Sequence, residues 1–222
     1  MERSSGPIFA IGRYLDIPAG VINDDLRRAV AVIEAVHGVG DLPRIPLYGT
    51  RFPAIAGVTR FRRGRFLYTA DGDAVSIAIE IAQEHRLLSA LHEIGHFHDL
   101  AGIGTPRRFE SAVGEDGELA DWRSAVVETE AVQRLIEVAE AGEARVAAQA
   151  RDQLDWRELW VRSYAQYIVE RVGRIDRAQS LDAFRPPETR PVYLPLHWHE
   201  DDFAMVGRAI DEMFGGLGWL KI

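Results

Sequence analysis

The residue pattern with the clearest chemical meaning is H-E-x-x-H, formed by His92, Glu93 and His96. Residues four positions apart in an α-helix lie on the same face, so the two imidazoles can point at one metal ion. A Zn²⁺ ion held there would lower the pKa of a water molecule, and Glu93 could take its proton. Chance would give roughly 0.02 such matches in a chain of this composition. The pattern therefore predicts a metal site; the alternative is an amphipathic helix with surface histidines.

A catalytic zinc site normally has three protein ligands and one position for water, so a third ligand must come from elsewhere. The predicted sheet before the pattern contains no histidine and few acids, which places the candidates downstream: Asp99, Glu128, Glu130, Glu158, His197 and His199. Glu158 is favoured, because it begins a helix on which the small Ala165 would permit close approach to the metal helix. The alternative for Glu158 is helix capping, since Asp155 and Glu158 are spaced as in a capping box.

The other acids and histidines near the pattern are less suited to bind the ion. Asp99 follows His96 by three residues, too close along one helix to complete a tetrahedron easily. We expect Asp99 to accept a hydrogen bond from a ligand imidazole, or else to be a solvent-exposed acid at the helix end. His98 points about 200° away from His96 and is predicted not to be a ligand. Glu128 and Glu130 lie in an Ala/Glu-rich segment where most glutamates face water.

Two segments resemble a known class of zinc peptidases. HEIGHFHD resembles the HExGHxxD form of the zinc-binding helix in lethal-factor-like gluzincins, and ELWVRSYAQYI resembles their later helix, whose leading Glu is the third ligand. The combination also resembles compact zincin-like proteins found in phage and prophage neighbourhoods. The resemblance covers roughly residues 75–172. It implies His92, His96 and Glu158 as zinc ligands and Glu93 as general base.

The chain departs from this resemblance at the group that assists the transition state. The lethal-factor type has a Tyr one or two turns before its ligand Glu, where this chain has Arg151, Asp152, Leu154 and Trp156. A donor to a tetrahedral oxyanion must then come from another residue, and the candidates are Tyr164, Tyr167, His197 and His199. On the helix wheel Tyr167 lies nearly opposite Glu158 and Tyr164 about 120° from it. His197 and His199 lie in a segment that could reach the cleft.

The metal helix is predicted from Leu87 to Leu100, with Gly102 as its stop. Before it, residues 45–48, 55–60 and 65–69 are predicted to form short strands. Residues 75–81 alternate between apolar and small or polar side chains, which predicts a half-buried strand. In zinc peptidases of this build the last strand borders the cleft and can pair with an extended peptide. We therefore expect an edge strand within residues 74–81.

The remaining segments predict an α+β fold in one zincin-like domain, with a small mixed sheet, the metal helix and a mostly helical C-terminal half. A helix is expected at 23–36, and loop 102–118 could form one rim of the cleft. Helical patterns follow over 119–150, divided at Gly142, and from Asp155 to near Gly173, with a last helix capped by Asp201 or Asp202. The predicted parts of the domain 1–222 are an irregular segment (1–22), the sheet and metal helix (23–100) and a helical subdomain (119–222).

Composition narrows the function. The net charge of −8 disfavours nucleic acid and anionic membranes as main partners. The absence of Cys excludes disulfides and thiolate metal sites. No signal peptide or long apolar stretch is recognised, so a cytoplasmic location is expected. The sequence predicts a Zn²⁺-dependent metalloendopeptidase acting on a peptide or protein substrate. The alternative is a non-catalytic zincin-fold module for binding or assembly, of the kind associated with phage.

Overall fold

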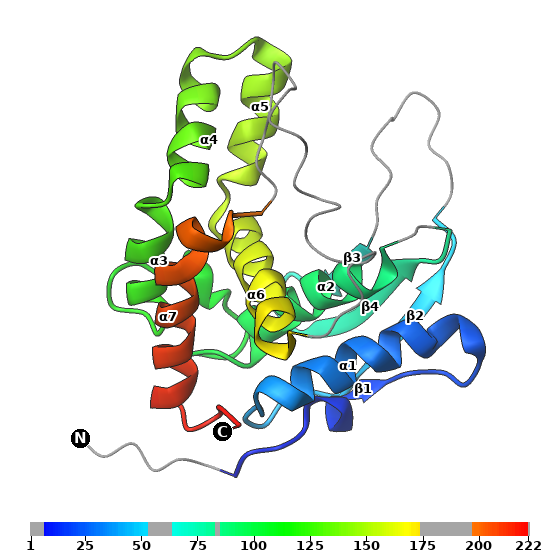
Figure 1. Ribbon diagram of the computed structural model, residues 1–222. Coiled ribbons are helices and arrows are strands. Elements are labelled where there is room, and N and C mark those ends of the chain that lie inside the picture. Colours follow the sequence, from blue (N-terminus) through cyan, green and yellow to red (C-terminus); the bar gives the residue numbers. More distant parts are fainter. Residues whose placement is uncertain (1–6, 53–63, 83–84, 174–196, 222) are drawn as a thin grey trace.

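The computed structural model describes residues 7–52, 64–82, 85–173 and 197–221. Within these ranges the chain is α+β and mostly helical, with seven α-helices and one four-stranded sheet (Figure 1). The strand predicted at residues 55–60 lies outside the described residues. None of the described helices combines the length and apolar character needed to cross a membrane.

The sheet has the order β1-β2-β4-β3. Strands β1 (Leu15–Asp16), β2 (Ile45–Thr50) and β4 (Ala74–Glu80) run parallel to one another, and β3 (Gly64–Tyr68) pairs antiparallel with β4. The prediction of an edge strand within residues 74–81 is therefore wrong, because β4 lies inside the sheet. It is also not half-buried, since Ser76 and Ala78 are buried as well as Ile77 and Ile79. Small side chains are compatible with burial on both faces of a strand, and β1 and β3 are the edge strands among the described residues.

The N-terminal segment is more ordered than the sequence indicated. Within the described part of residues 1–22, a 3-10 helix (Ile11–Tyr14) leads into β1, and a second (Val21–Asn23) precedes α1. Ile11 is fully buried, and Leu15 pairs with Ile45 of β2. Helix α1 (Asp24–Val36) confirms the predicted helix at 23–36.

Two long helices meet beside the sheet. Helix α2 (Arg86–Ala101) carries the H-E-x-x-H pattern and ends at Gly102, as predicted. Helix α6 (Trp156–Val172) begins after Asp155 and ends at Gly173, also as predicted. Fully buried Ile94 of α2 and Val161 of α6 belong to the main apolar core. The core thus fixes α2 and α6 side by side, which positions the residues that they carry.

The helical half differs from the prediction in two places. Residues 119–150 begin three helices rather than two: α3 (Ala120–Val127), α4 (Glu130–Ala141) and α5 (Ala144–Gln153). The extra break lies at Thr129, whose side chain caps α4 by accepting from the Val132 N–H. Asp202 lies within α7 (Glu200–Gly216) and accepts from the N–H groups of Glu130 and Ala131. It therefore supports the start of α4, and the residue preceding α7 is His199.

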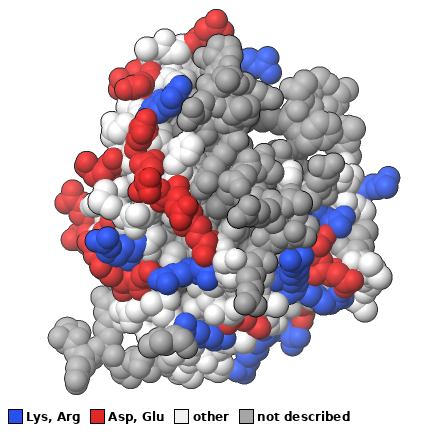
Figure 2. Space-filling view, viewed as in Figure 1, with Lys and Arg blue, Asp and Glu red and all other residues white. Residues whose placement is uncertain are grey.

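Helices α4 and α5 form a hairpin that projects from the rest of the molecule (Figure 1). Leu135, Ala139 and Ala150 make a small apolar cluster between the two helices. Figure 2 shows acidic side chains gathered over α3, α4 and the start of α7. On the face shown, acidic side chains therefore gather over the helical half.

Candidate metal centre

The histidine pair projects from α2 on the side away from the helix's buried apolar residues. Leu87, Leu91 and Ile94 are at most 1% exposed and anchor the helix in the core. The rings of His92 and His96 lie 5.1 Å apart between centroids and are nearly perpendicular, at 84°. Their side chains are 28% and 14% exposed, so the helix holds both while leaving them accessible.

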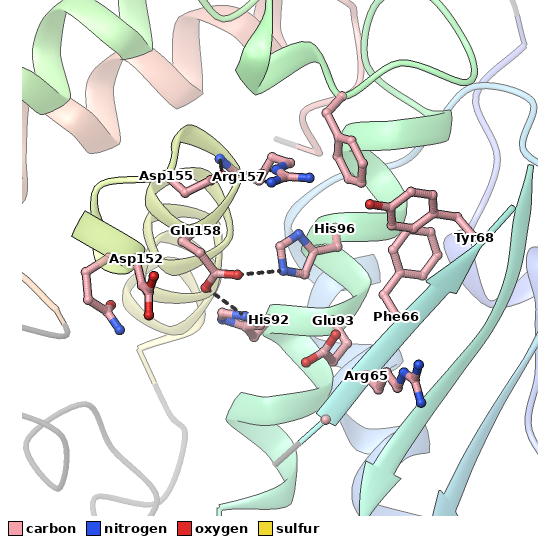
Figure 3. Close-up of a pocket in the computed structure, with 13 residues that line it drawn as sticks. Arg65, Phe66, Tyr68, His92, Glu93, His96, Asp152, Asp155, Arg157 and Glu158 are labelled. Atoms are coloured by element: carbon pink, nitrogen blue, oxygen red, sulfur yellow. Dashed lines mark hydrogen bonds and ion pairs between the residues drawn. The ribbon is translucent and has the colours of Figure 1, made fainter. Parts of the chain in front are cut away.

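Glu158 reaches this pair from the first turn of α6 (Figure 3). Its Oε1 lies 3.5 Å from His96 Nε2, and its Oε2 lies 3.6 Å from His92 Nε2. The start of α6 is capped by Asp155, whose carboxylate accepts from the Arg157 N–H. The Glu158 carboxylate therefore faces the two imidazoles, and the helix start has another cap.

Gly95 permits the close crossing that brings Glu158 to the pair. A Cβ atom at this position would lie 3.0 Å from the Tyr164 ring and 3.2 Å from a Val161 methyl group, both on α6. Such contacts are tighter than ordinary van der Waals packing, so any larger residue would push α6 away from α2. The glycine inside the H-E-x-G-H sequence thus sets the distance between the two ligand-bearing helices.

The geometry of the three groups fits a divalent metal ion. Ligand atoms from His92, His96 and Glu158 all lie within 4.8 Å of one another. In a tetrahedron with ligands about 2.1 Å from Zn²⁺, neighbouring ligand atoms are about 3.4 Å apart. The separations of 3.5 and 3.6 Å found here are close to that value. They exceed the roughly 2.7–3.2 Å of most N–H···O hydrogen bonds. Among the described residues, these three form the only such His/Asp/Glu group.

Charge and burial prepare the group to bind a cation. Burial lowers the pKa of His92 to about 4, with Glu158 partly opposing, so this imidazole is neutral at pH 7. Burial alone would raise the pKa of Glu158, but the two histidines and Arg162 lower it to about 2. Burial likewise disfavours protonation of His96, yet the Glu158 and Glu93 carboxylates raise its pKa above the ordinary value. A metal ion would compete with a proton at His96, so affinity should fall on acidification.

Glu93 lies between the histidine pair and the edge of the sheet. A Cβ atom on Gly64 of β3 would come within 2.5 Å of the Glu93 side chain, so glycine is required for this approach. Burial raises the pKa of Glu93 to about 7, although His96 and a hydrogen bond from the Phe66 backbone N–H oppose the rise. A carboxyl group with a pKa near neutrality can both accept and return a proton.

The group opens into a cleft of about 540 Å³. One wall is β3, with Arg65, Phe66 and Tyr68 lining the cleft, and the facing wall is the start of α6 (Figure 3). Because β3 is an edge strand of the described sheet, one side of its backbone is not paired with another described strand. The cleft therefore combines a metal-binding group, a carboxyl group beside it and a strand edge.

Asp99 is fully buried and accepts two hydrogen bonds from Ser111. One carboxylate oxygen accepts from the Ser111 N–H at 2.8 Å, and the other accepts from the Ser111 hydroxyl at 2.5 Å. Asp99 also interacts electrostatically with His96. Its carboxylate thus ties the loop after α2 to the metal helix, and this loop places Phe109 at the rim of the cleft. The expectation that loop 102–118 contributes a rim agrees with this position.

The four candidate donors to the transition state lie in different places, and the Tyr167 hydroxyl donates to Asp211 of α7. Tyr164 is fully buried on the opposite side of the helix pair, with its hydroxyl 2.9 Å from His37 Nε2, and does not line the cleft. His197 lines an adjoining cavity of about 240 Å³ together with His92 and Glu158. His199 is exposed at the start of α7 and lines neither cavity. Only His197 is brought near the metal-binding group.

The other candidate ligands are not part of the group. Glu128 is exposed at the end of α3, and Glu130 begins α4 with its N–H bound to Asp202. His98 points into the core, as the helix geometry predicted, and is fully buried.

Several residues of the cleft were not identified from the sequence. They are Gly64, Arg65, Phe66 and Tyr68 on β3, Phe109 in the loop after α2, Asp152 and Gln153 at the end of α5, and Arg157 in the first turn of α6. Arg157 makes two side-chain hydrogen bonds to Asp155, at 3.0 and 2.9 Å. The Asp155-x-Arg157 spacing at a helix start was the available signal for this pair. The residues on β3 could be found only once β3 was known to be the edge strand.

Comparison with known proteins adds no relative: no protein family, curated protein or solved structure matches this chain. The case for function therefore depends on the geometry of the site and on the sequence pattern.

Proposed function

We propose that the protein is a metal-dependent peptide hydrolase of zincin type, with His92, His96 and Glu158 as ligands for Zn²⁺. The observation that carries this proposal is the convergence of three metal-binding side chains from two helices beside a buried Glu93. A site that only stabilises the fold needs no such carboxyl group, and a closed structural site does not open into a cleft.

A bound Zn²⁺ ion would act as a Lewis acid on the substrate carbonyl and increase the acidity of the attacking water. Glu93 is the residue that accepts the proton of this water and later transfers it to the leaving nitrogen. Without a bound metal ion, burial raises the pKa of Glu93 to about 7, and the positive charge of Zn²⁺ would favour its carboxylate form, which accepts protons. Arg162 is buried and donates through Nε to the Glu158 backbone carbonyl, which holds the first turn of α6 in place.

The shape of the cleft favours an extended peptide as substrate. A peptide could add to the outer edge of β3 as a further antiparallel or parallel strand, using backbone hydrogen bonds. This addition would place a peptide carbonyl between β3 and the ligand group. The resemblance of HEIGHFHD and ELWVRSYAQYI to lethal-factor-like gluzincins supports the same assignment.

The test replaces Glu93 by Gln, which keeps size and hydrogen bonding but cannot accept a proton. We expect the zinc-loaded wild type to cleave peptides from a mixed library, with cleavage stopped by a chelator. Glu93→Gln should lower kcat by about 10³-fold or more while zinc still binds one to one. Glu128→Gln, an exposed glutamate at the end of α3, is the matched control and should leave both unchanged.

Two results would contradict the proposal. A Glu93→Gln protein that no longer binds zinc would make Glu93 a ligand or structural residue. A wild type that binds zinc and cleaves no member of the library would favour the non-catalytic binding or assembly module.

A further inference from the structure

In the proposed reaction negative charge develops on the carbonyl oxygen, and a hydrogen-bond donor placed there would stabilise it together with the metal ion. The tyrosines of α6 do not supply it. The Tyr164 hydroxyl bonds to His37, and the Tyr167 hydroxyl donates to Asp211 at 2.6 Å. Neither tyrosine lines the cleft. His197 lines the adjoining cavity and not the cleft, so the donor is sought among the residues that line the cleft itself.

We propose that Tyr68, on the edge strand β3, donates this hydrogen bond, an inference that rests on the proposed peptidase function. Tyr68 lines the cleft, and 44% of its surface is exposed, so the hydroxyl is accessible to a substrate. Figure 3 shows the hydroxyl pointing into the cleft toward His96. Glu93 lines the same cleft, and in this view it lies apart from the Tyr68 hydroxyl, on the other side of Phe66.

The Tyr68 ring is held in this direction before any substrate binds. It stacks on Phe66 at 5.7 Å between centroids and meets Phe109 edge-on at 5.2 Å. Phe109 in turn lies 6.3 Å from the His96 ring. These contacts form a continuous aromatic wall from β3 to the metal helix. A donor fixed by packing needs little reorganisation during the reaction, which is the condition for strong electrostatic stabilisation.

The cationic side chains that line the cleft are less suited to this role. The Arg157 guanidinium is committed to Asp155 through two hydrogen bonds. Arg65 points away from the histidine pair in Figure 3. Arg157 nevertheless lines the same cleft as Tyr68. Its positive charge would favour negative charge on a nearby oxyanion without a direct contact.

The experiment compares Tyr68→Phe with wild type, because this change removes the hydroxyl and keeps the aromatic wall. Tyr48→Phe on β2, which lines no described cavity, is the matched control. The measurements are kcat, KM, zinc stoichiometry and the inhibition constant of a phosphonate analogue of the best peptide substrate. Tyr68→Phe should lower kcat by about 10²-fold, with KM within about threefold and zinc unchanged. The phosphonate should bind more weakly by a similar factor, since it mimics the tetrahedral oxyanion.

The outcomes separate this inference from the proposed function. A wild type without activity overturns both. An active wild type whose Tyr68→Phe variant keeps kcat and phosphonate affinity within threefold overturns only the role of Tyr68. A Tyr68→Phe variant with raised KM, unchanged kcat and unchanged phosphonate affinity shows a packing role and also overturns it. A Gln153→Ala variant is measured alongside, and a loss of phosphonate affinity there rather than in Tyr68→Phe would move the assignment to Gln153.

Discussion

Helix α2 carries three histidines within seven residues, and its two faces treat them differently. His92 and His96 face Glu158 across the cleft and keep partial access to solvent. His98 lies on the other face, fully buried among the rings of His37, Phe214 and Trp219, at 5.3, 5.7 and 5.4 Å between centroids. Two positions along the helix thus separate a metal-binding environment from an aromatic core.

The difference shows that the groups around a histidine determine its pKa and its ability to bind a metal ion. Carboxylates raise the pKa of His96 despite its burial, whereas burial lowers the pKa of His98 far below the ordinary value. Neither ring nitrogen of His98 has a hydrogen-bond partner among the described residues. His98 therefore acts as a flat apolar side chain, whereas His96 belongs to a group that could hold a metal ion.

The largest expected effect is that of His96→Phe on zinc affinity, compared with His98→Phe. His96→Phe removes one of three ligands and should weaken zinc binding on the order of 10³-fold. His98→Phe should leave zinc affinity within about threefold, because His98 faces away from the metal-binding group. Competition with a chelating dye measures both affinities at one pH.

His98→Phe also tests whether His98 acts as an apolar side chain in the core. Replacing an imidazole that has no hydrogen-bond partner by an apolar ring should be nearly neutral for the free energy of unfolding. A loss of zinc in His98→Phe, with the fold intact by circular dichroism, would show that the two faces are not independent.

The second prediction concerns Gly95, which lies where α2 touches α6. Gly95→Val should reduce the free energy of unfolding by about 3 kcal/mol, because its side chain would clash with Val161 and Tyr164. It should also weaken zinc binding, since a displaced α6 carries Glu158 away from the histidines. Gly114→Val is the matched control, because a Cβ atom at Gly114 meets nothing within 4 Å. Equal destabilisation by the two changes would contradict a role for close helix packing.

Local patterns were sufficient to predict much of the site. The four-residue spacing of His92 and His96 required only helix geometry, and Gly102 and Gly173 marked helix ends correctly. Glu158 was favoured for its place on an apolar helix, and the structure brings its carboxylate to the pair. Each of these predictions depends on residues close together in one helix: the histidine spacing, the glycine at a helix end, or the position of Glu158 in the first turn.

Features that depend on contacts distant in sequence were missed. The choice between β3 and β4 as edge strand depends on pairing between segments, which alternating side chains do not reveal. The small residues Ser76 and Ala78 were read as solvent-facing but are buried. Likewise Asp202 caps α4, some 70 residues away, where proximity in sequence indicated α7.

The buried face also predicts a pH dependence of stability. His37 is stacked on Phe214 at 4.2 Å, its Nδ1–H donates to the Gly38 carbonyl, and its Nε2 accepts from the Tyr164 hydroxyl. Burial lowers its pKa in the folded protein to about 4, from 6.5. The unfolded chain therefore takes up the proton first as the pH falls. The stabilising contribution is fully present above pH 6.5 and is lost as the pH falls toward 4.

The smallest expected effect is the change in the free energy of unfolding that the protonation of His37 causes between pH 8 and pH 5. Protonation of His37 in the unfolded chain lowers the free energy of unfolding by about 2 kcal/mol at pH 5, relative to pH 8. His37→Gln keeps a polar atom facing Tyr164 but carries no charge, so its stability should fall by about 2 kcal/mol less than that of wild type over this range. Urea unfolding of both proteins at pH 8 and pH 5 measures the difference. Titrating groups that do not interact with His37 contribute equally in both proteins, and parallel pH curves would show that His37 is not buried in its neutral form.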